Sequence, residues 1–184
     1  MLHLSTQNMV LSIEKSPLLV KQGIVYQEYQ DFFDKDIIKQ VTQLSNLNMV
    51  PLEKQVEKQR CRVDYQEEIM KRLDIFFRHT SITKALEQKF GTNLKFSSVD
   101  IWQDRPGYFL EPHTDDPRIK LALQIYLGDD SIGTSLYDKE NNILKTFEYK
   151  LNCGYALLNT DISRHGTAGK VNDKVRNSIY VRYG

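Results

Sequence analysis

The sequence predicts an α+β fold, with one domain in which helices come first and a β-barrel follows. The chain has 184 residues, a length that suits one domain and leaves little room for a second. Apolar residues at helical spacing dominate the first half, whereas short strand-like runs separated by turn residues fill the second half. The composition, 40% hydrophobic and 27% charged, is typical of a globular protein with a packed core.

The first half, about residues 1–92, is expected to be a helical support. A helix is predicted to begin at Asp34, because aspartate suits a helix start and Ile37, Val41 and Leu44 then recur on one face. A second helical region is predicted further along the chain, interrupted once and ended by a glycine. This region covers Gln66–Phe90, breaks near Thr80 and Ser81, and stops at Gly91.

A charged run from Lys54 to Arg62 separates the two helical regions. Its low apolar content predicts a solvated loop. The alternative is a mobile flap that brings Arg60 or Arg62 over a functional site.

The second half, about residues 93–184, is expected to form the barrel. Turn residues such as Gly128-Asp129-Asp130 and Asn141-Asn142 separate its short strands. Strands at this spacing predict a barrel of the jelly-roll kind. The predicted strands are Leu94–Trp102, Ile119–Leu127, Thr134–Tyr137, Leu144–Tyr149, Gly154–Asn159 and Asn177–Tyr183.

Two of the four histidines stand in a pattern that indicates a metal site. His113 and Asp115 are two residues apart, so on an extended segment both side chains project from one face. This pair is common by chance, but His165 follows about fifty residues later, just before a predicted strand. Two histidines and one carboxylate form the facial triad that holds non-haem Fe(II) and leaves three positions open.

Arg176 stands at the start of the last predicted strand. A guanidinium is always charged and can bind a carboxylate through two parallel hydrogen bonds. An iron site with a carboxylate clamp is what an oxoacid cosubstrate would require.

The second half, from about Val99 to Tyr183, resembles the 2-oxoglutarate- and Fe(II)-dependent dioxygenases, and their prolyl-hydroxylase-like branch most of all. The order of the motifs and the gap between the histidines carry the resemblance. The matching residues are Pro106-Gly107-Tyr108, His113-Thr114-Asp115, Tyr126-Leu127, Gly133-Thr134-Ser135-Leu136-Tyr137, His165 and Arg176-Asn177-Ser178.

The resemblance implies a double-stranded β-helix, the cupin-like form of the jelly roll. It implies that His113, Asp115 and His165 bind Fe(II), and that Arg176 pairs with the distal carboxylate of 2-oxoglutarate. The reaction would consume O2, release succinate and CO2, and hydroxylate a substrate. The resemblance adds Ser178, Tyr126 and Gln103 as candidate cosubstrate contacts, each of which could also be structural. Trp102, the sole tryptophan, is expected to be a core residue.

The substrate is expected to be a small molecule or a peptide. One alternative is a nucleic-acid demethylase of the same superfamily, which the net charge of +1 and the lack of a long insert disfavour. The other is a cupin-like barrel that binds a metal without catalysis, or that uses zinc for hydrolysis. Neither the non-catalytic barrel nor the zinc hydrolase gives Arg176 a role. Candidate residues at the mouth of the site have mixed charge and choose no substrate: Asp104, Arg105, Asp116 and Arg118.

The location of the protein is expected to be cytoplasmic. No apolar run approaches the ~20 residues of a membrane span, and no signal-peptide pattern opens the chain. Cys61 and Cys153 are far apart, which indicates free thiols in a reducing compartment. The sequence leaves the oligomeric state open.

Overall fold

Two antiparallel sheets form the framework of the protein in a computed structural model, which describes residues 2–52 and 59–184. The large sheet has the strand order β1-β2-β9-β6-β11-β5-β4-β3, and the small sheet has the order β10-β7-β8. The strands are β1 (Leu19–Lys21), β2 (Ile24–Tyr29), β3 (Met49–Pro51), β4 (Arg60–Val63), β5 (Phe96–Asp104), β6 (Leu121–Tyr126), β7 (Thr134–Tyr137), β8 (Ile143–Thr146), β9 (Gly154–Leu158), β10 (His165–Thr167) and β11 (Arg176–Tyr183).

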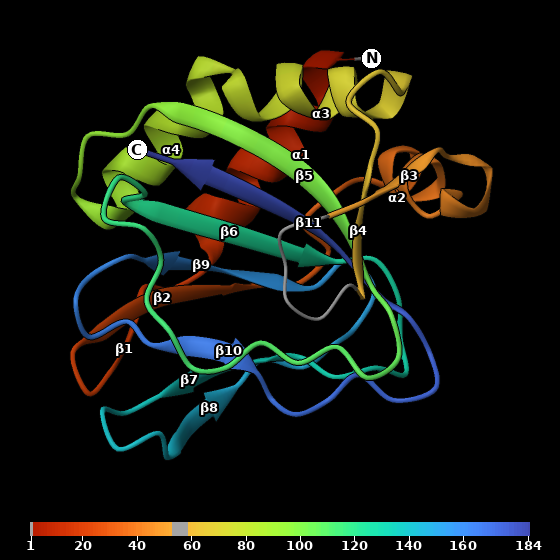
Figure 1. The fold of residues 1–184 in the computed structure, drawn as a ribbon. Helices are drawn as coiled ribbons and strands as arrows, with labels where there is room; N and C mark the ends of the chain where they lie inside the picture. Colours follow the sequence, from red (N-terminus) through yellow and green to blue (C-terminus); the bar gives the residue numbers. More distant parts are fainter. Residues whose placement is uncertain (1, 53–58) are drawn as a thin grey trace.

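The helices and the small sheet lie on opposite sides of the large sheet (Figure 1). The helices are α1 (Leu2–Lys15), α2 (Lys35–Val41), α3 (Glu68–Arg78) and α4 (Thr80–Phe90), and a 3₁₀ turn covers Leu44–Asn46. None of the helices in the described ranges is both long and apolar enough to cross a membrane.

Each central strand of the large sheet divides its side chains between two faces, because successive residues of a strand point to opposite sides. On β11, Ile179, Val181 and Tyr183 belong to the main hydrophobic core with the helices. The intervening residues Arg176 and Tyr180 face the other side, where they line a cavity. In β6, in β11 and in β5 from Ser98 onward, the odd-numbered residues therefore lie on the helix side and the even-numbered residues face the small sheet. Phe96 of β5 precedes a register shift and packs in the core with the helices.

The predicted helices of the first half are confirmed. The side chain of Asp34 accepts a hydrogen bond from the backbone N–H of Ile37, which caps α2 at its start. The break between α3 and α4 falls at His79, and Gly91 ends α4 in the left-handed conformation, with φ of 65°. Cys61 and Cys153 are free, as predicted.

The strands of the first half differ from the expected division into a helical support and a barrel. Strands β1 to β4 all lie before residue 92 and complete both ends of the large sheet. Strands β1 and β3 pair only with their near neighbours β2 and β4. Strands β2 and β4 join these hairpins to the rest of the sheet through partners distant in sequence, as when Tyr26 of β2 pairs with Leu157 of β9, and local patterns do not reveal that placement.

The solvated loop predicted for Lys54–Arg62 is wrong at its end. Residues 54–58 lie outside the described residues, but Arg60 and Arg62 belong to β4, which pairs with β5. The two arginines are tolerated inside a sheet because each has a partner. Arg60 pairs with Asp104, and the Arg62 guanidinium lies 3.9 Å from the centre of the Tyr65 ring.

Candidate active site

Three side chains that could hold a metal ion come together at the edge of the small sheet. The candidate ligand atoms of His113, Asp115 and His165 all lie within 4.8 Å of one another. The Nε2 atoms of His113 and His165 lie 3.8 and 3.7 Å from the two carboxylate oxygens of Asp115. Two imidazoles and one carboxylate facing a common point match the donor set of a facial metal site.

The backbone itself holds the two histidines side by side. The N–H of His113 donates to the carbonyl of His165 at 3.0 Å, and the N–H of His165 donates to the carbonyl of His113 at 2.8 Å. The two histidines are about fifty residues apart in sequence. This pair of hydrogen bonds holds their backbones together, so their side chains begin next to each other.

The hydrogen bonds of both imidazoles prepare their Nε2 atoms for a metal. His113 Nδ1 lies 2.8 Å from the carbonyl oxygen of Glu111, and His165 Nδ1 lies 3.1 Å from that of Ser163. A carbonyl oxygen only accepts, so each Nδ1 carries the proton and each Nε2 keeps a free lone pair. Burial lowers the pKa of His165, which favours the neutral form that binds metals. The residues present therefore fit a divalent metal ion.

Tyr180 supports the carboxylate of this site from β11. Its hydroxyl donates to an oxygen of Asp115 at 2.8 Å. Burial, together with the nearby Asp115 charge, raises the pKa of Tyr180, so this hydroxyl stays protonated as a donor. Tyr180 thus orients the carboxylate without competing for the metal.

The three candidate ligands line one part of a cavity of about 230 Å³ between the sheets. The rest of the lining combines arginines, aromatic rings and small polar residues. It consists of Arg60, Trp102, Leu110, Gln124, Thr134, Tyr155, Gly166, Thr167, Arg176, Tyr180 and Arg182.

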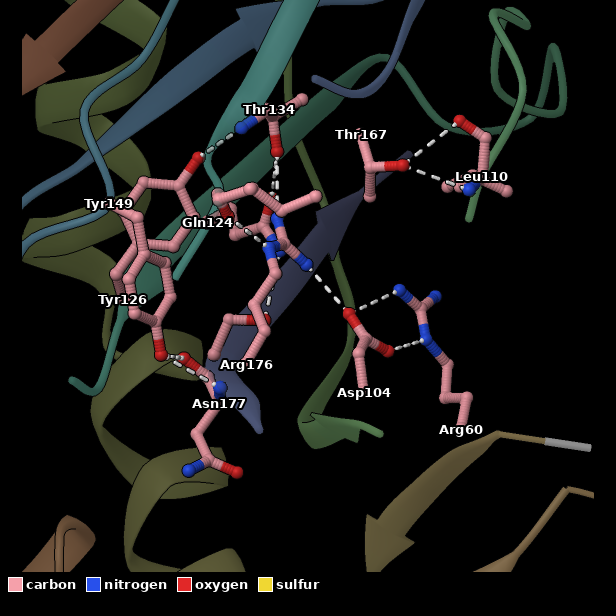
Figure 2. A network of polar contacts seen from close by, with 12 residues as sticks. Arg60, Asp104, Leu110, Gln124, Tyr126, Thr134, Tyr149, Thr167, Arg176 and Asn177 are labelled. Carbon is pink, nitrogen blue, oxygen red and sulfur yellow. Dashed lines mark hydrogen bonds and ion pairs between the residues drawn. The ribbon is translucent and has the colours of Figure 1, made fainter. Parts of the chain in front are cut away.

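Arg176 brings a buried positive charge to this cavity. Its side chain is 2% exposed, and its guanidinium donates to Asp104 at 2.7 Å, to Thr134 Oγ1 at 2.9 Å and to the carbonyl of Ile132 at 2.9 Å. Figure 2 shows Asp104 between Arg176 and Arg60, which bonds the same carboxylate from β4. Burial opposes the charge of Arg176, but Asp104 together with the neighbouring Tyr126 and Tyr155 keeps the pKa of Arg176 above its usual value.

A chain of buried hydrogen bonds extends from Arg176 across the sheet. Thr134 Oγ1 donates to Gln124 Oε1 at 3.0 Å, and Tyr155 donates to the same oxygen at 2.8 Å. The Gln124 amide in turn donates to Ser178 Oγ at 2.9 Å. Because its donors and acceptors are matched, the network holds Arg176 in one position.

The sequence matches no family model and no curated protein, but the structure matches solved ones. An oxidoreductase of the 2OG-Fe(II) oxygenase family from Burkholderia pseudomallei aligns at a TM-score of 0.67 and 14% identity, over 97% of this chain and 89% of that one. The chain has the fold of the 2OG-Fe(II) oxygenases. A prolyl hydroxylase from Trichoplax adhaerens, in complex with a hypoxia inducible factor peptide fragment, aligns at 0.65 and 12% identity, over 99% and 89% of the two chains. HygX from Streptomyces hygroscopicus, with nickel, 2-oxoglutarate and hygromycin B bound, aligns at 0.62 and 12% identity, over 86% and 82%.

Within this oxygenase fold, the structure brings together four of the residues singled out by sequence: His113, Asp115, His165 and Arg176 all line the cavity. Tyr126 and Ser178 lie behind the lining and are fully buried. The Tyr126 ring packs 5.4 Å from the Arg176 guanidinium, and its hydroxyl accepts from the N–H of Thr134. Both residues support the cavity wall rather than face the cavity.

Gln103 and Asp104 differ from what the sequence suggests. Gln103 is an odd-numbered residue of β5, so it points away from the cavity, and its amide donates to Asn177 at 3.3 Å. Asp104, expected among exposed charges at the mouth, is fully buried because two arginines bond it. Asp116 and Arg118, in contrast, form an exposed pair.

Several residues that line the cavity were not predicted from the sequence. Tyr180, Gln124 and Thr134 carry no motif that marks chemistry, although Thr134 stands in a segment that matched the family. For Tyr180 and Gln124, the alternation with apolar neighbours on β11 and β6 is the signal that could have found them. Trp102, expected in the core, lines the cavity instead.

Proposed function

We propose that the protein is a 2-oxoglutarate- and Fe(II)-dependent dioxygenase that hydroxylates a small-molecule or peptide substrate. The observation that carries this proposal is a buried arginine facing the same small cavity as a His-Asp-His cluster. In this proposal the two sheets are the halves of a double-stranded β-helix, and residues 1–184 form one oxygenase domain.

His113, Asp115 and His165 would hold the iron through two Nε2 atoms and one carboxylate oxygen, which leaves positions for other ligands. Bound there with 2-oxoglutarate and O2, Fe(II) would supply the oxidation that yields succinate, CO2 and a hydroxylated product. The protein would contribute fixed ligand orientation, because the Glu111 and Ser163 carbonyls and the Tyr180 hydroxyl set the geometry.

Arg176 would bind the distal carboxylate of 2-oxoglutarate. A guanidinium has five N–H bonds, and the contacts to Asp104, Thr134 and Ile132 use three of them. One N–H remains on each terminal nitrogen and is available to a carboxylate. A barrel that only stores a metal, or a zinc hydrolase, has no use for this clamp.

The test is anaerobic addition of Fe(II) and 2-oxoglutarate, which should produce a visible metal-to-ligand absorption band. Arg176→Lys keeps the charge but loses the fork, so 2-oxoglutarate should bind about tenfold more weakly while metal binding persists. His165→Ala should abolish metal binding and succinate release, whereas His79→Ala, at an exposed site far from the cavity, should retain both. Absence of the band, or an unchanged affinity in Arg176→Lys, would contradict the proposal.

A further inference from the structure

The cavity continues beyond the metal cluster, on the side away from Arg176. On β11, Arg176, Tyr180 and Arg182 are all even-numbered and line the cavity, with Tyr180 bonded to Asp115. The candidate metal position therefore lies between two arginines of one strand. Trp102 of β5 also lines the cavity, and its register partner Ser178 lies between Arg176 and Tyr180 on β11.

Two residues of the cavity lining carry N–H groups that lack an acceptor. Trp102 Nε1 and Arg182 Nε are both buried, and neither has a hydrogen-bond partner among the described residues. A buried donor without a partner costs about 1–3 kcal/mol. A ligand with acceptor oxygens would remove that cost at both positions.

The charged side chains on this face of the large sheet have a net positive charge, which also favours an anionic ligand. Arg60, Arg62, Arg176 and Arg182 lie on the cavity-facing side of β4 and β11, and the facing carboxylates of β5 are Asp100 and Asp104. Asp104 bonds Arg60 and Arg176, while Asp100 bonds Arg182 and Tyr65. Two positive charges remain when Asp115 is assigned to the metal ion that it would hold, and the distal carboxylate of 2-oxoglutarate would balance one of them.

We propose that the substrate carries an anionic oxygen group, a carboxylate or a phosphate, which binds to Arg182 and Trp102. This inference rests on the proposed function, because the cosubstrate occupies the Arg176 end and leaves the Arg182 end to the substrate. Arg182 supplies charge and an N–H, and Trp102 supplies a second N–H and a flat apolar surface.

Trp102 also supplies the measurement, since it is the only tryptophan of the chain and its fluorescence reports on this cavity. The protein is loaded with Zn(II), which does not turn over, and with saturating 2-oxoglutarate. It is then titrated with N-acetylglycine, with methyl phosphate, and with neutral N-acetylglycinamide. At least one anion should change the emission saturably while the amide does not, and the stronger anion identifies the group.

Arg182→Met should weaken binding of that anion at least tenfold. Arg78→Met, which removes an exposed arginine of α3 that is also paired with an aspartate, should leave it unchanged. Arg182→Lys keeps the charge but lacks the Nε donor, so its affinity for the anion should lie between those of the other two variants. Trp102→Phe, measured by calorimetry, should weaken anion binding several-fold. Retained Zn(II) binding shows that each variant is folded.

The outcomes separate this inference from the proposed function. Binding of 2-oxoglutarate without binding of either anion, equal binding of the neutral amide, or full affinity in Arg182→Met would overturn the anion site alone. Anion binding that depends on Arg182, in a protein that does not bind 2-oxoglutarate, would uphold the anion site and contradict the dioxygenase.

Discussion

At the scale of single residues, the hydroxyl of Tyr180 has a role distinct from that of its ring. The hydroxyl bonds Asp115, a candidate metal ligand, and the ring lines the cavity. We expect Tyr180→Phe to lower metal affinity about 10- to 100-fold, as loss of a partner to a metal ligand does elsewhere. Calorimetric titration with Mn(II) or Zn(II) measures the change.

Tyr183→Phe is the matched control for this prediction. It makes the same chemical change on the same strand, but the Tyr183 hydroxyl donates to the carbonyl of Phe77 on the helix side of the sheet. Metal affinity should therefore be unaffected in Tyr183→Phe. Equal losses in the two variants would show that Tyr180 acts only through stability.

The buried imidazole of His165 predicts a pH dependence for the metal-free protein. Burial lowers its pKa in the folded state, whereas the unfolded chain keeps a pKa of about 6.5. As the pH falls below that value, the unfolded state takes up a proton that the folded state does not, so the free energy of unfolding decreases. Above the unfolded pKa, His165 is neutral in both states and this loss of stability is absent.

Urea unfolding at pH 7.5 and pH 5.5 checks this in parent and variant. His165→Asn keeps an N–H for the Ser163 carbonyl but does not titrate. We expect the variant to lose less stability than the parent between the two pH values. An equal loss in both would show that His165 titrates normally in the fold.

At the scale of elements, β10 is a three-residue strand packed tightly against the segment before His113. A Cβ on Gly166 would lie 2.5 Å from the carbonyl oxygen of Leu110, while the neighbouring His165 and Thr167 bond that same segment through their backbones. Gly166→Ala should therefore push β10 away, weaken metal binding at least tenfold and destabilise the fold by about 1–3 kcal/mol.

Gly169→Ala is the control for β10, because a Cβ there meets nothing within 4 Å. Metal titration and thermal unfolding of the two variants, side by side, separate a local displacement from a general effect of alanine. Unchanged metal binding in Gly166→Ala would show that the segment adapts without moving His165.

The elements also show why the sequence revealed some parts of the structure and not others. Helix α2 and the break between α3 and α4 depend on local signals, a capping Asp34 and the end of an apolar repeat, so the sequence predicted them. Strands β2 and β4 depend on partners far away in the chain, and β1 and β3 join the sheet only through them. Strand β10 is too short for any alternation to be visible.

The residues of the candidate site also include some that the sequence predicted and some that it did not. His113, Asp115, His165 and Arg176 combine residue types and spacing that match a known chemistry, so they could be found in advance. Gln103 illustrates the limit, because a position one residue away from a site residue in a strand belongs to the opposite face. Arg60 lay within a charged run, and only its pairing with Asp104 shows its place.

At the scale of the whole molecule, metal binding should stabilise the fold, because the ligands come from segments fifty residues apart that only folding unites. A metal at about 100 times its dissociation constant would add about 2.7 kcal/mol to the free energy of unfolding. For a chain of this size that corresponds to a rise in melting temperature of roughly 5–10 °C. Thermal unfolding with Zn(II), then with excess chelator, measures the rise and its reversal.

His113→Ala should melt at the same temperature with and without Zn(II). A rise of equal size in that variant would place the stabilising metal at another part of the protein.

The two-sided central strands have a consequence for how this protein can diverge. Along β5, β6 and β11, residues that choose a ligand alternate with residues that hold the helices, so the two sets occupy different positions. Selection on activity can act on Trp102 and Arg182 while Ile101, Ile179 and Val181 stay unchanged. A library that varies only those even-numbered positions would therefore explore new substrates while it leaves the helix-side core unchanged.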